Sequence, residues 1–224
     1  MRPAGGSRVG RCAVALAVAV TLASSAALAD ERKDRPYLYL QPLGQELPEA
    51  DVALVKRALV GFYKLEIKVL PRVDLPAQAF YKPRSRYRAE KLLDFLEARR
   101  PKDGYRILGL TGVDISTTNG AIHDWGILGL ATMDGGACVI SSFRCKMRSR
   151  GAQHARERLA KVAVHEIGHT LGLDHCPTVG CVMEDARGLV KTCDREYDLC
   201  AKCRRQLKEK GRPLPAAEIP WPRP

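Results

Sequence analysis

The segment from His165 to His175 constrains this chain more than any other part of the sequence. His165 and His169 are four residues apart, and four residues of α-helix turn by about 400°, so both imidazoles face one side. A straight helix would turn by about 600° between His169 and His175 and would point the third imidazole away. Glycine readily adopts the left-handed conformation that ends a helix. We therefore expect the helix to end at Gly172 and the chain to reverse, which returns His175 to the other two histidines.

Three imidazoles that converge in this way suit one zinc ion. Imidazole nitrogens bind Zn²⁺ at about 2.0–2.1 Å, and a site with three protein ligands keeps a fourth position open for water. Glu166 follows the first histidine and can accept a proton from that water without binding the metal. The pattern predicts a catalytic zinc held by His165, His169 and His175, with Glu166 as the general base. The alternative, an amphipathic helix with surface histidines, does not account for the five fixed positions.

Cysteines crowd behind the last histidine. Cys176 and Cys181 are separated by four residues, and Cys200 and Cys203 by two. Two pairs of this kind can close a tetrahedron around a second zinc, with Zn–S distances of about 2.3 Å. Because four thiolates leave no open position, we expect this second zinc to be structural. It would stabilise a region with little apolar mass and fix the loop that delivers His175.

Residues 1–29 have the pattern of a signal peptide. A basic start is followed by an apolar run from Cys12 to about Leu22, and Ala27-Leu28-Ala29 fits the small-x-small cleavage rule. We expect cleavage before Asp30, export to the periplasm or the extracellular space, and no membrane association afterwards. A retained membrane anchor is the alternative.

Export bears on the cysteines, because oxidising compartments favour disulfides. Cys176 and Cys181, or Cys200 and Cys203, could form a disulfide, unless zinc binds first and protects the thiols. The sequence has eight cysteines, of which Cys12 would leave with the signal peptide, and the odd number that remains cannot all be paired. Cys193 could also compete as a zinc ligand. Our guess is that Cys193 pairs with Cys138 or Cys145, which lie too far apart along a strand to bridge each other.

Hydrophobic periodicity predicts an α+β fold, a mixed β-sheet packed on helices. We expect strands at 37–44, 65–71, 105–112, 124–131 and 137–144, with a hairpin turn at 132–136. We expect helices at 48–63, 89–99, 153–171 and 196–209, and a loop at 72–86. The domain would span 30–208, with an N-terminal subdomain to about 172, a zinc-stapled C-terminal subdomain from about 173, and a proline-rich tail at 209–224.

The chain is basic, with a formal net charge of +12. Such a balance can indicate nucleic acid or an anionic surface as partner. Lysines and arginines are scattered, however, and the few aromatic residues are not interleaved with them. We therefore expect a solvated basic surface and no nucleic-acid partner. The basic stretch at 202–212 beside the cysteine knuckles is the feature that would support the opposite view.

Residues 165–203 resemble the archaemetzincins, a branch of the metzincin clan of zinc peptidases. The family pattern is H-E-x-x-H-x-x-G-x-x-H-C, four residues, C-x-M, a longer spacer and C-x-x-C; here the spacer is one residue short of the usual length. The resemblance covers about 36–208 and implies a metzincin-like fold with an active-site helix, two zincs on the histidines and cysteines above, and Glu166 as general base. It implies that Met183 is the Met-turn methionine beneath the histidines. It also implies that strand 124–131 is the edge strand that pairs with an extended substrate.

Other polar residues carry weaker signals. His123 and His154 lie outside the motif, and we expect surface or supporting roles for them. Glu184, Asp185 and Arg187 could line a substrate site or be solvated loop residues.

These observations predict a secreted zinc metallopeptidase that acts on a peptide or protein and cleaves either internally or at N-termini. The alternative is a non-catalytic zinc-binding protein that uses a metzincin fold to hold a peptide. The intact Glu166 argues against that alternative, and activity on a peptide library would separate the two.

Overall fold

The computed structural model describes residues 37–223. The expected signal peptide at 1–29 lies outside these residues. Within the described part of the chain, no helix is long and apolar enough to cross a membrane.

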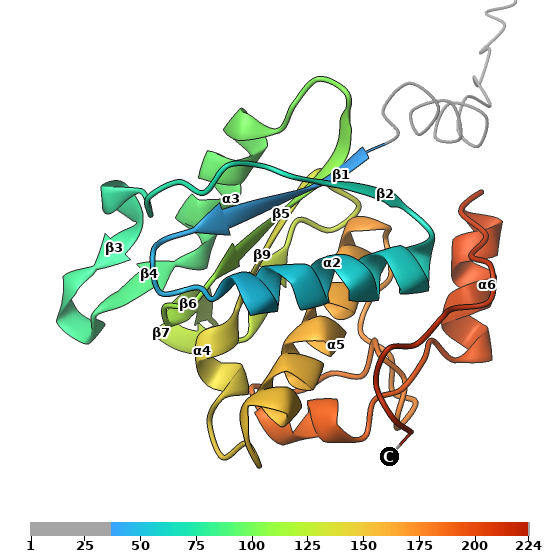
Figure 1. Cartoon of the computed structure of the whole chain (residues 1–224). Coiled ribbons are helices and arrows are strands. Elements are labelled where there is room, and N and C mark those ends of the chain that lie inside the picture. Colours follow the sequence, from blue (N-terminus) through green and yellow to red (C-terminus); the bar gives the residue numbers. More distant parts are fainter. Residues whose placement is uncertain (1–36, 224) are drawn as a thin grey trace, which may run out of the picture.

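A five-stranded sheet forms the centre of the molecule (Figure 1). Its order is β2 (Glu66–Val69), β1 (Tyr37–Leu43), β5 (Gly104–Thr111), β9 (Ala137–Ser141) and β8 (Gly129–Ala131). The first four strands are parallel, and β8 is antiparallel at the edge. Every residue of β5 is buried, as expected for a parallel strand covered on both faces.

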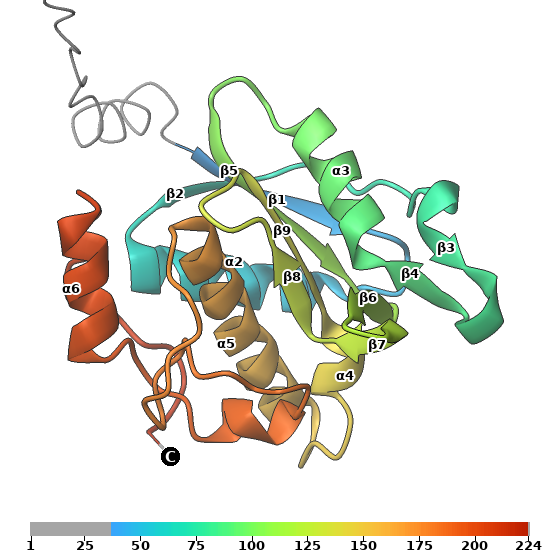
Figure 2. The ribbon, with the colours of Figure 1, turned by 180° about the vertical axis from the view of Figure 1, so that it is seen from behind.

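Helices cover both faces of this sheet (Figures 1 and 2). Helices α2 (Glu49–Tyr63) and α5 (Ala152–Thr170) lie on one face, and α3 (Ala89–Arg99) lies on the other. The buried positions of α2 recur at the spacing of one helical face, for example Val52, Val55 and Leu59. On the other face, Leu92 and Leu96 of α3 belong to a second apolar cluster with residues of β5 and β9. The predicted α+β class, a mixed sheet packed on helices, is confirmed.

A second sheet of four short strands was only partly predicted. Its order is β3 (Phe80–Tyr81), β4 (Arg86–Arg88), β6 (Ile115–Asn119) and β7 (Ile122–Ile127). The loop expected at 72–86 contains β3 and ends where β4 begins, and β6 was missed. The single strand expected at 124–131 is two strands, because β7 pairs with β6 and β8 pairs with β9. The chain passes from one sheet to the other at Leu128.

Two predicted elements end differently from our expectation. The strand expected to reach residue 144 ends at Ser141, whose hydroxyl accepts a hydrogen bond from Phe143 N at 3.1 Å and caps the short helix α4 (Ser142–Cys145). The helix expected at 196–209 begins only at Ala201, as α6 (Ala201–Glu209), and a 3-10 helix, η3 (Val190–Asp194), precedes it.

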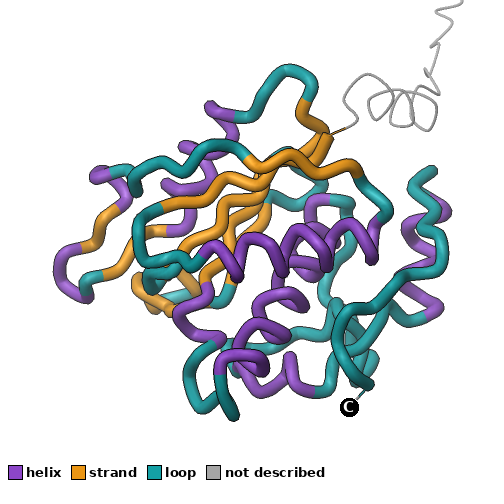
Figure 3. The backbone as a smooth tube through the Cα atoms, viewed as in Figure 1, coloured by secondary structure: helices purple, strands orange, loops and turns teal. Residues whose placement is uncertain are grey.

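The segment after α5 is mostly irregular, and the tail folds back onto the domain (Figure 3). Trp221 is 4% exposed and stacks on Phe62 of α2 with ring centroids 6.2 Å apart. Its indole nitrogen donates to the Tyr197 carbonyl at 3.1 Å. The proline-rich tail therefore contributes to the core beneath α2.

Candidate metal centres

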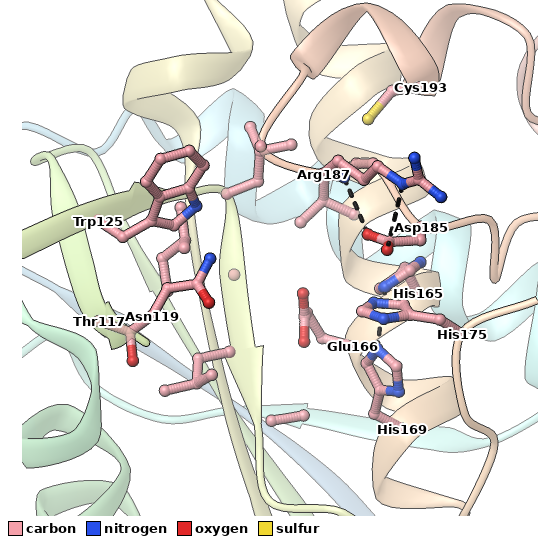
Figure 4. Close-up of a pocket in the computed structure, with 18 of the residues that line it drawn as sticks. Thr117, Asn119, Trp125, His165, Glu166, His169, His175, Asp185, Arg187 and Cys193 are labelled. Carbon is pink, nitrogen blue, oxygen red and sulfur yellow. Dashed lines mark hydrogen bonds and ion pairs between the residues drawn. The ribbon is translucent and has the colours of Figure 1, made fainter. Parts of the chain in front are cut away.

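The three histidines of the motif meet at one point, as predicted. Their ligand nitrogens all lie within 4.8 Å of one another, and the Nε2 atoms of His165 and His169 are 3.0 Å apart. Both residues project from α5, and His175 approaches from the segment that follows the helix (Figure 4). His175 is exposed to the cleft, whereas His169 is buried.

The turn at Gly172 produces this convergence. Gly172 has a φ of +84°, in the left-handed region that the sequence predicted. Its N–H donates to the His169 carbonyl at 2.9 Å, and the next N–H, of Leu173, donates to the Gly168 carbonyl at 3.0 Å. These two bonds form a Schellman motif, which satisfies the last carbonyls of α5 while the chain reverses.

Backbone carbonyls fix the orientation of two of the imidazoles. His165 Nδ1 bonds the Val182 carbonyl and His169 Nδ1 bonds the Leu173 carbonyl, each at 2.7 Å. Each Nδ1 therefore carries the proton and leaves Nε2 free as a metal ligand. Burial and the neighbouring histidines lower the pKa of His165 to about 3, and burial also lowers the pKa of His169. Both are neutral near pH 7, the form that binds metal.

Glu166 lies beside the histidines and points into the same cleft (Figure 4). It is 6% exposed, and burial raises the pKa of its carboxyl group to about 8. Its position depends on Gly129 of β8, which the sequence did not single out. A Cβ at residue 129 would lie 2.5 Å from Glu166 Oε1 and 2.7 Å from its Cγ. The edge strand can therefore approach the carboxylate this closely only because residue 129 has no side chain.

Met183 lies against α5 at Gly168. It is fully buried, and a Cβ at Gly168 would overlap its sulfur atom. The turn that carries Met183 is tied to the histidine loop, because Cys176 N donates to the Met183 carbonyl at 2.7 Å. The neighbouring Val182 carbonyl orients His165. This arrangement agrees with the role that the family resemblance implies for Met183, and it gives Gly168, at a variable position of the motif, a packing role.

The four expected cysteines form a second cluster. The Sγ atoms of Cys176, Cys181, Cys200 and Cys203 all lie within 4.8 Å of one another. Cys176 is 3.7 Å from Cys200, and Cys181 is 3.8 Å from Cys203, between Sγ atoms. A tetrahedron with Zn–S bonds of about 2.3 Å has edges of about 3.8 Å, so these distances suit zinc. The hydrogen bond between the Cys181 and Cys203 sulfur atoms lowers the pKa of Cys181, which favours the thiolate that a metal requires.

The remaining cysteines of the described chain are separate from this cluster. Cys138, Cys145 and Cys193 are buried free thiols, and burial raises the pKa of all three, that of Cys145 to about 12. Our guess of a disulfide to Cys193 is therefore wrong for this structure. Cys193 lines the cleft instead of joining the four-cysteine cluster.

A cleft of about 760 Å³ surrounds the histidines and Glu166. One side is the continuous edge formed by β7 and β8, and the opposite side is α5 with the loop after Met183 (Figure 4). Trp125 of β7 reaches across to that loop, because a Cβ at Gly188 would lie 2.9 Å from its ring. Asp185 and Arg187 line the cleft. Sequence reasoning did not single out Trp125, whose place depends on the unpredicted pairing of β6 with β7.

Three other sequence candidates have structural partners elsewhere. Glu184 is buried, accepts a hydrogen bond from Gly180 N at 2.9 Å, and is ion-paired with Arg195. His154 Nε2 lies 2.8 Å from Asp194. His123 packs its ring on Tyr81, with centroids 5.4 Å apart. None of the three belongs to a metal cluster in the described part of the chain.

An i, i+4 histidine pair on a helix, a third histidine after a glycine turn, a buried glutamate and a methionine turn below them define a zinc metallopeptidase of the metzincin type. Both clusters supply ligands that suit zinc, nitrogen in one and sulfur in the other.

Comparison with known proteins agrees with this class. Peptidase family M54 matches residues 49–209. The chain is 32% identical over 173 residues to the archaemetzincin of Haloquadratum walsbyi. The alignment covers 74% of this chain and 96% of that protein. The chain therefore belongs to the archaemetzincin family, peptidase family M54.

Solved structures support the same conclusion for the fold. The crystal structure of archaemetzincin from Methanopyrus kandleri matches with a TM-score of 0.68 at 30% identity, over 80% of this chain and 97% of that one. Archaemetzincin from Archaeoglobus fulgidus, solved in complex with malonate, matches with a TM-score of 0.65 at 31% identity, over 78% and 99% of the two chains. The resemblance inferred from residues 165–203 is thus confirmed for most of the domain.

Proposed function

We propose that this metallopeptidase cleaves an extended peptide laid along β8, with His165, His169 and His175 as the ligands of a catalytic zinc and Glu166 as the acid–base group. The observation that carries the proposal is the convergence of three imidazoles and one buried carboxyl group at the edge of the sheet.

The chain's own groups account for most of the chemistry. The free edge of β8 offers backbone groups that can pair with a substrate strand. When bound, zinc supplies a Lewis acid at the scissile carbonyl and activates water. The Glu166 carboxylate takes a proton from the attacking water and passes it to the leaving amine. Burial raises the pKa of Glu166 to about 8, which stabilises the protonated form that carries the proton to the leaving amine.

Replacement of Glu166 tests this assignment. We expect Glu166→Gln to keep zinc on the histidines and to lower kcat by about 10²- to 10⁴-fold, because the amide cannot accept the proton. Zinc content and hydrolysis of a peptide library are measured on the same preparation. Glu157→Gln, on the same helix but hydrogen-bonded only to Gln153, is the matched control. Full turnover in Glu166→Gln would defeat the mechanism, and a wild-type chain that binds peptides without cleaving them would favour a non-catalytic peptide-binding protein.

Two finer points belong to the same proposal. The signal-like pattern of residues 1–29 supports export to the periplasm or the extracellular space. The four-cysteine cluster supports a second, structural zinc, held by Cys176, Cys181, Cys200 and Cys203. N-terminal sequencing of the chain recovered from the exporting cell tests the first, since Asp30 should be its first residue.

A further inference from the structure

One buried carboxylate lines the cleft without a partner of its own. Glu196 is 2% exposed and is part of the cleft wall. Among the described residues its side chain makes no hydrogen bond and no ion pair within 4.0 Å. A buried charged group without a partner is costly, and natural proteins rarely keep one without a reason. Burial accordingly raises the pKa of Glu196 to about 8.

The neighbouring cations are engaged elsewhere. Lys161, on α5, donates to the Cys193 carbonyl at 2.8 Å and influences Glu196 only from a distance. Arg195 is ion-paired with Glu184. Arg187, on the loop after Met183, has a side chain that is 85% exposed and lies near Asp185. Within the described chain, therefore, no cation lies within 4.0 Å of the Glu196 carboxyl group. A cationic ligand placed there would favour its ionised form.

The surroundings of Glu196 suit the stem of a long side chain. Val162, one turn before His165 on α5, lines the same cleft and is 3% exposed. Cys193 also lines it, and its raised pKa keeps the thiol neutral. An apolar wall with an acidic group matches a lysine or arginine side chain, whose methylenes pack on apolar surface while the charged end meets a carboxylate.

We propose that Glu196 is a specificity-determining residue that binds a basic side chain, lysine or arginine, of the peptide substrate. The inference rests on the proposed peptidase function, because it assigns the substrate class of that site. A bound cation supplies the partner that Glu196 lacks. A neutral or acidic side chain at the same place would leave the carboxylate buried and unpaired, which is a penalty against such peptides.

The test uses the full zinc-loaded chain and a set of peptides in which one residue is varied at each position in turn. Lysine, arginine, norleucine and glutamate are compared. For one position we expect kcat/KM to be about 10- to 100-fold higher for lysine or arginine than for norleucine, the range for a hydrogen bond to a charged group. Glu196→Gln should remove most of this preference and leave the norleucine peptide within about twofold. Glu209→Gln, on the exposed face of α6, should change neither.

A second measurement separates this inference from the peptidase function. The same peptides are bound, without turnover, to the Glu166→Gln chain with and without Glu196→Gln, and their Kd values are compared. A preference for lysine in binding that depends on Glu196 supports the inference even if no peptide is hydrolysed. Hydrolysis with no preference for basic residues at any position overturns the inference and leaves the peptidase intact. Equal loss for every peptide in Glu196→Gln also overturns it, because Glu196 would then be structural.

Discussion

Gly129 controls the position of Glu166, although it lies outside the histidine motif. The carboxylate lies against the backbone of β8, and a side chain at residue 129 would occupy its place. The same absence of a side chain at Gly168 admits Met183 beneath the helix. At the scale of single residues, the site therefore depends on close backbone approach as much as on its ligands.

Gly129→Ala tests this dependence. We expect zinc to stay bound and kcat to fall by about 10- to 100-fold, because a displacement of the acid–base group of up to 1 Å can cost that much. Peptide hydrolysis and zinc content are the measurements. Gly120→Ala, at a φ of +55° where an added Cβ has no neighbour within 4 Å, has the conformational cost of a lost glycine without a clash, and its kcat should stay unchanged. Unchanged turnover in Gly129→Ala would show that Glu166 has room to move.

At the scale of elements, the C-terminal end of α5 connects two of the three histidine ligands, His169 and His175, to the rest of the fold. Its Schellman turn returns His175, and Leu173 of that turn orients His169. Arg212, 4% exposed, donates to the Leu171 carbonyl at 2.8 Å and to Asp134 Oδ1 at 2.7 Å. The helix end, the hairpin turn before β9 and the C-terminal tail are thereby joined at one place.

Gly172→Ala tests the turn. Alanine in the left-handed region should lower the free energy of unfolding by about 1–2 kcal/mol, and zinc bound to the histidines should dissociate more readily. Gly172→Asn is the matched variant, because asparagine tolerates this conformation better. Denaturant unfolding and zinc competition with a chelator measure the two effects. If alanine and asparagine behave alike, the left-handed conformation is not what the position requires.

At the scale of the whole molecule, the two clusters meet at adjacent residues of the chain. His175 ends the histidine site and Cys176, the next residue, begins the cysteine site. The segment after α5 has little regular structure, so a metal that joins Cys176 and Cys181 to α6 would hold the loop that carries His175. We therefore expect the cysteine zinc to stabilise the fold and the histidine zinc to serve chemistry.

Metal analysis with a free-thiol count tests this division. We expect two zincs per chain, with the four clustered cysteines reduced but protected from thiol reagents. His165→Ala should bind one zinc with little loss of Tm, and Cys200→Ser should bind one with a large loss of Tm. Cys145→Ser, outside the cluster, should still bind two. One zinc in the wild type, together with oxidised cysteines, would replace the second site by disulfides.

Much of the site could be predicted because its information is local. The spacing of His165 and His169, the turn at Gly172 and the two cysteine pairs depend on helix geometry and short loops, which a sequence states directly. Most long helices and strands were also predictable from their apolar periodicity. Strands β3, β4 and β6 were not, because they are short and are stabilised by pairing with distant segments rather than by their own pattern.

The sequence by itself determined which atoms could bind metal and in what order they occur along the chain. Only the tertiary structure decided that Gly129 lies against Glu166, that Trp125 reaches the loop at Gly188, and that Glu196 lines the cleft unpaired. The physical reason is the same for all three. Each feature depends on segments that are far apart in the sequence. The backbone pairing and packing that bring these segments together leave no periodic pattern in the residues themselves.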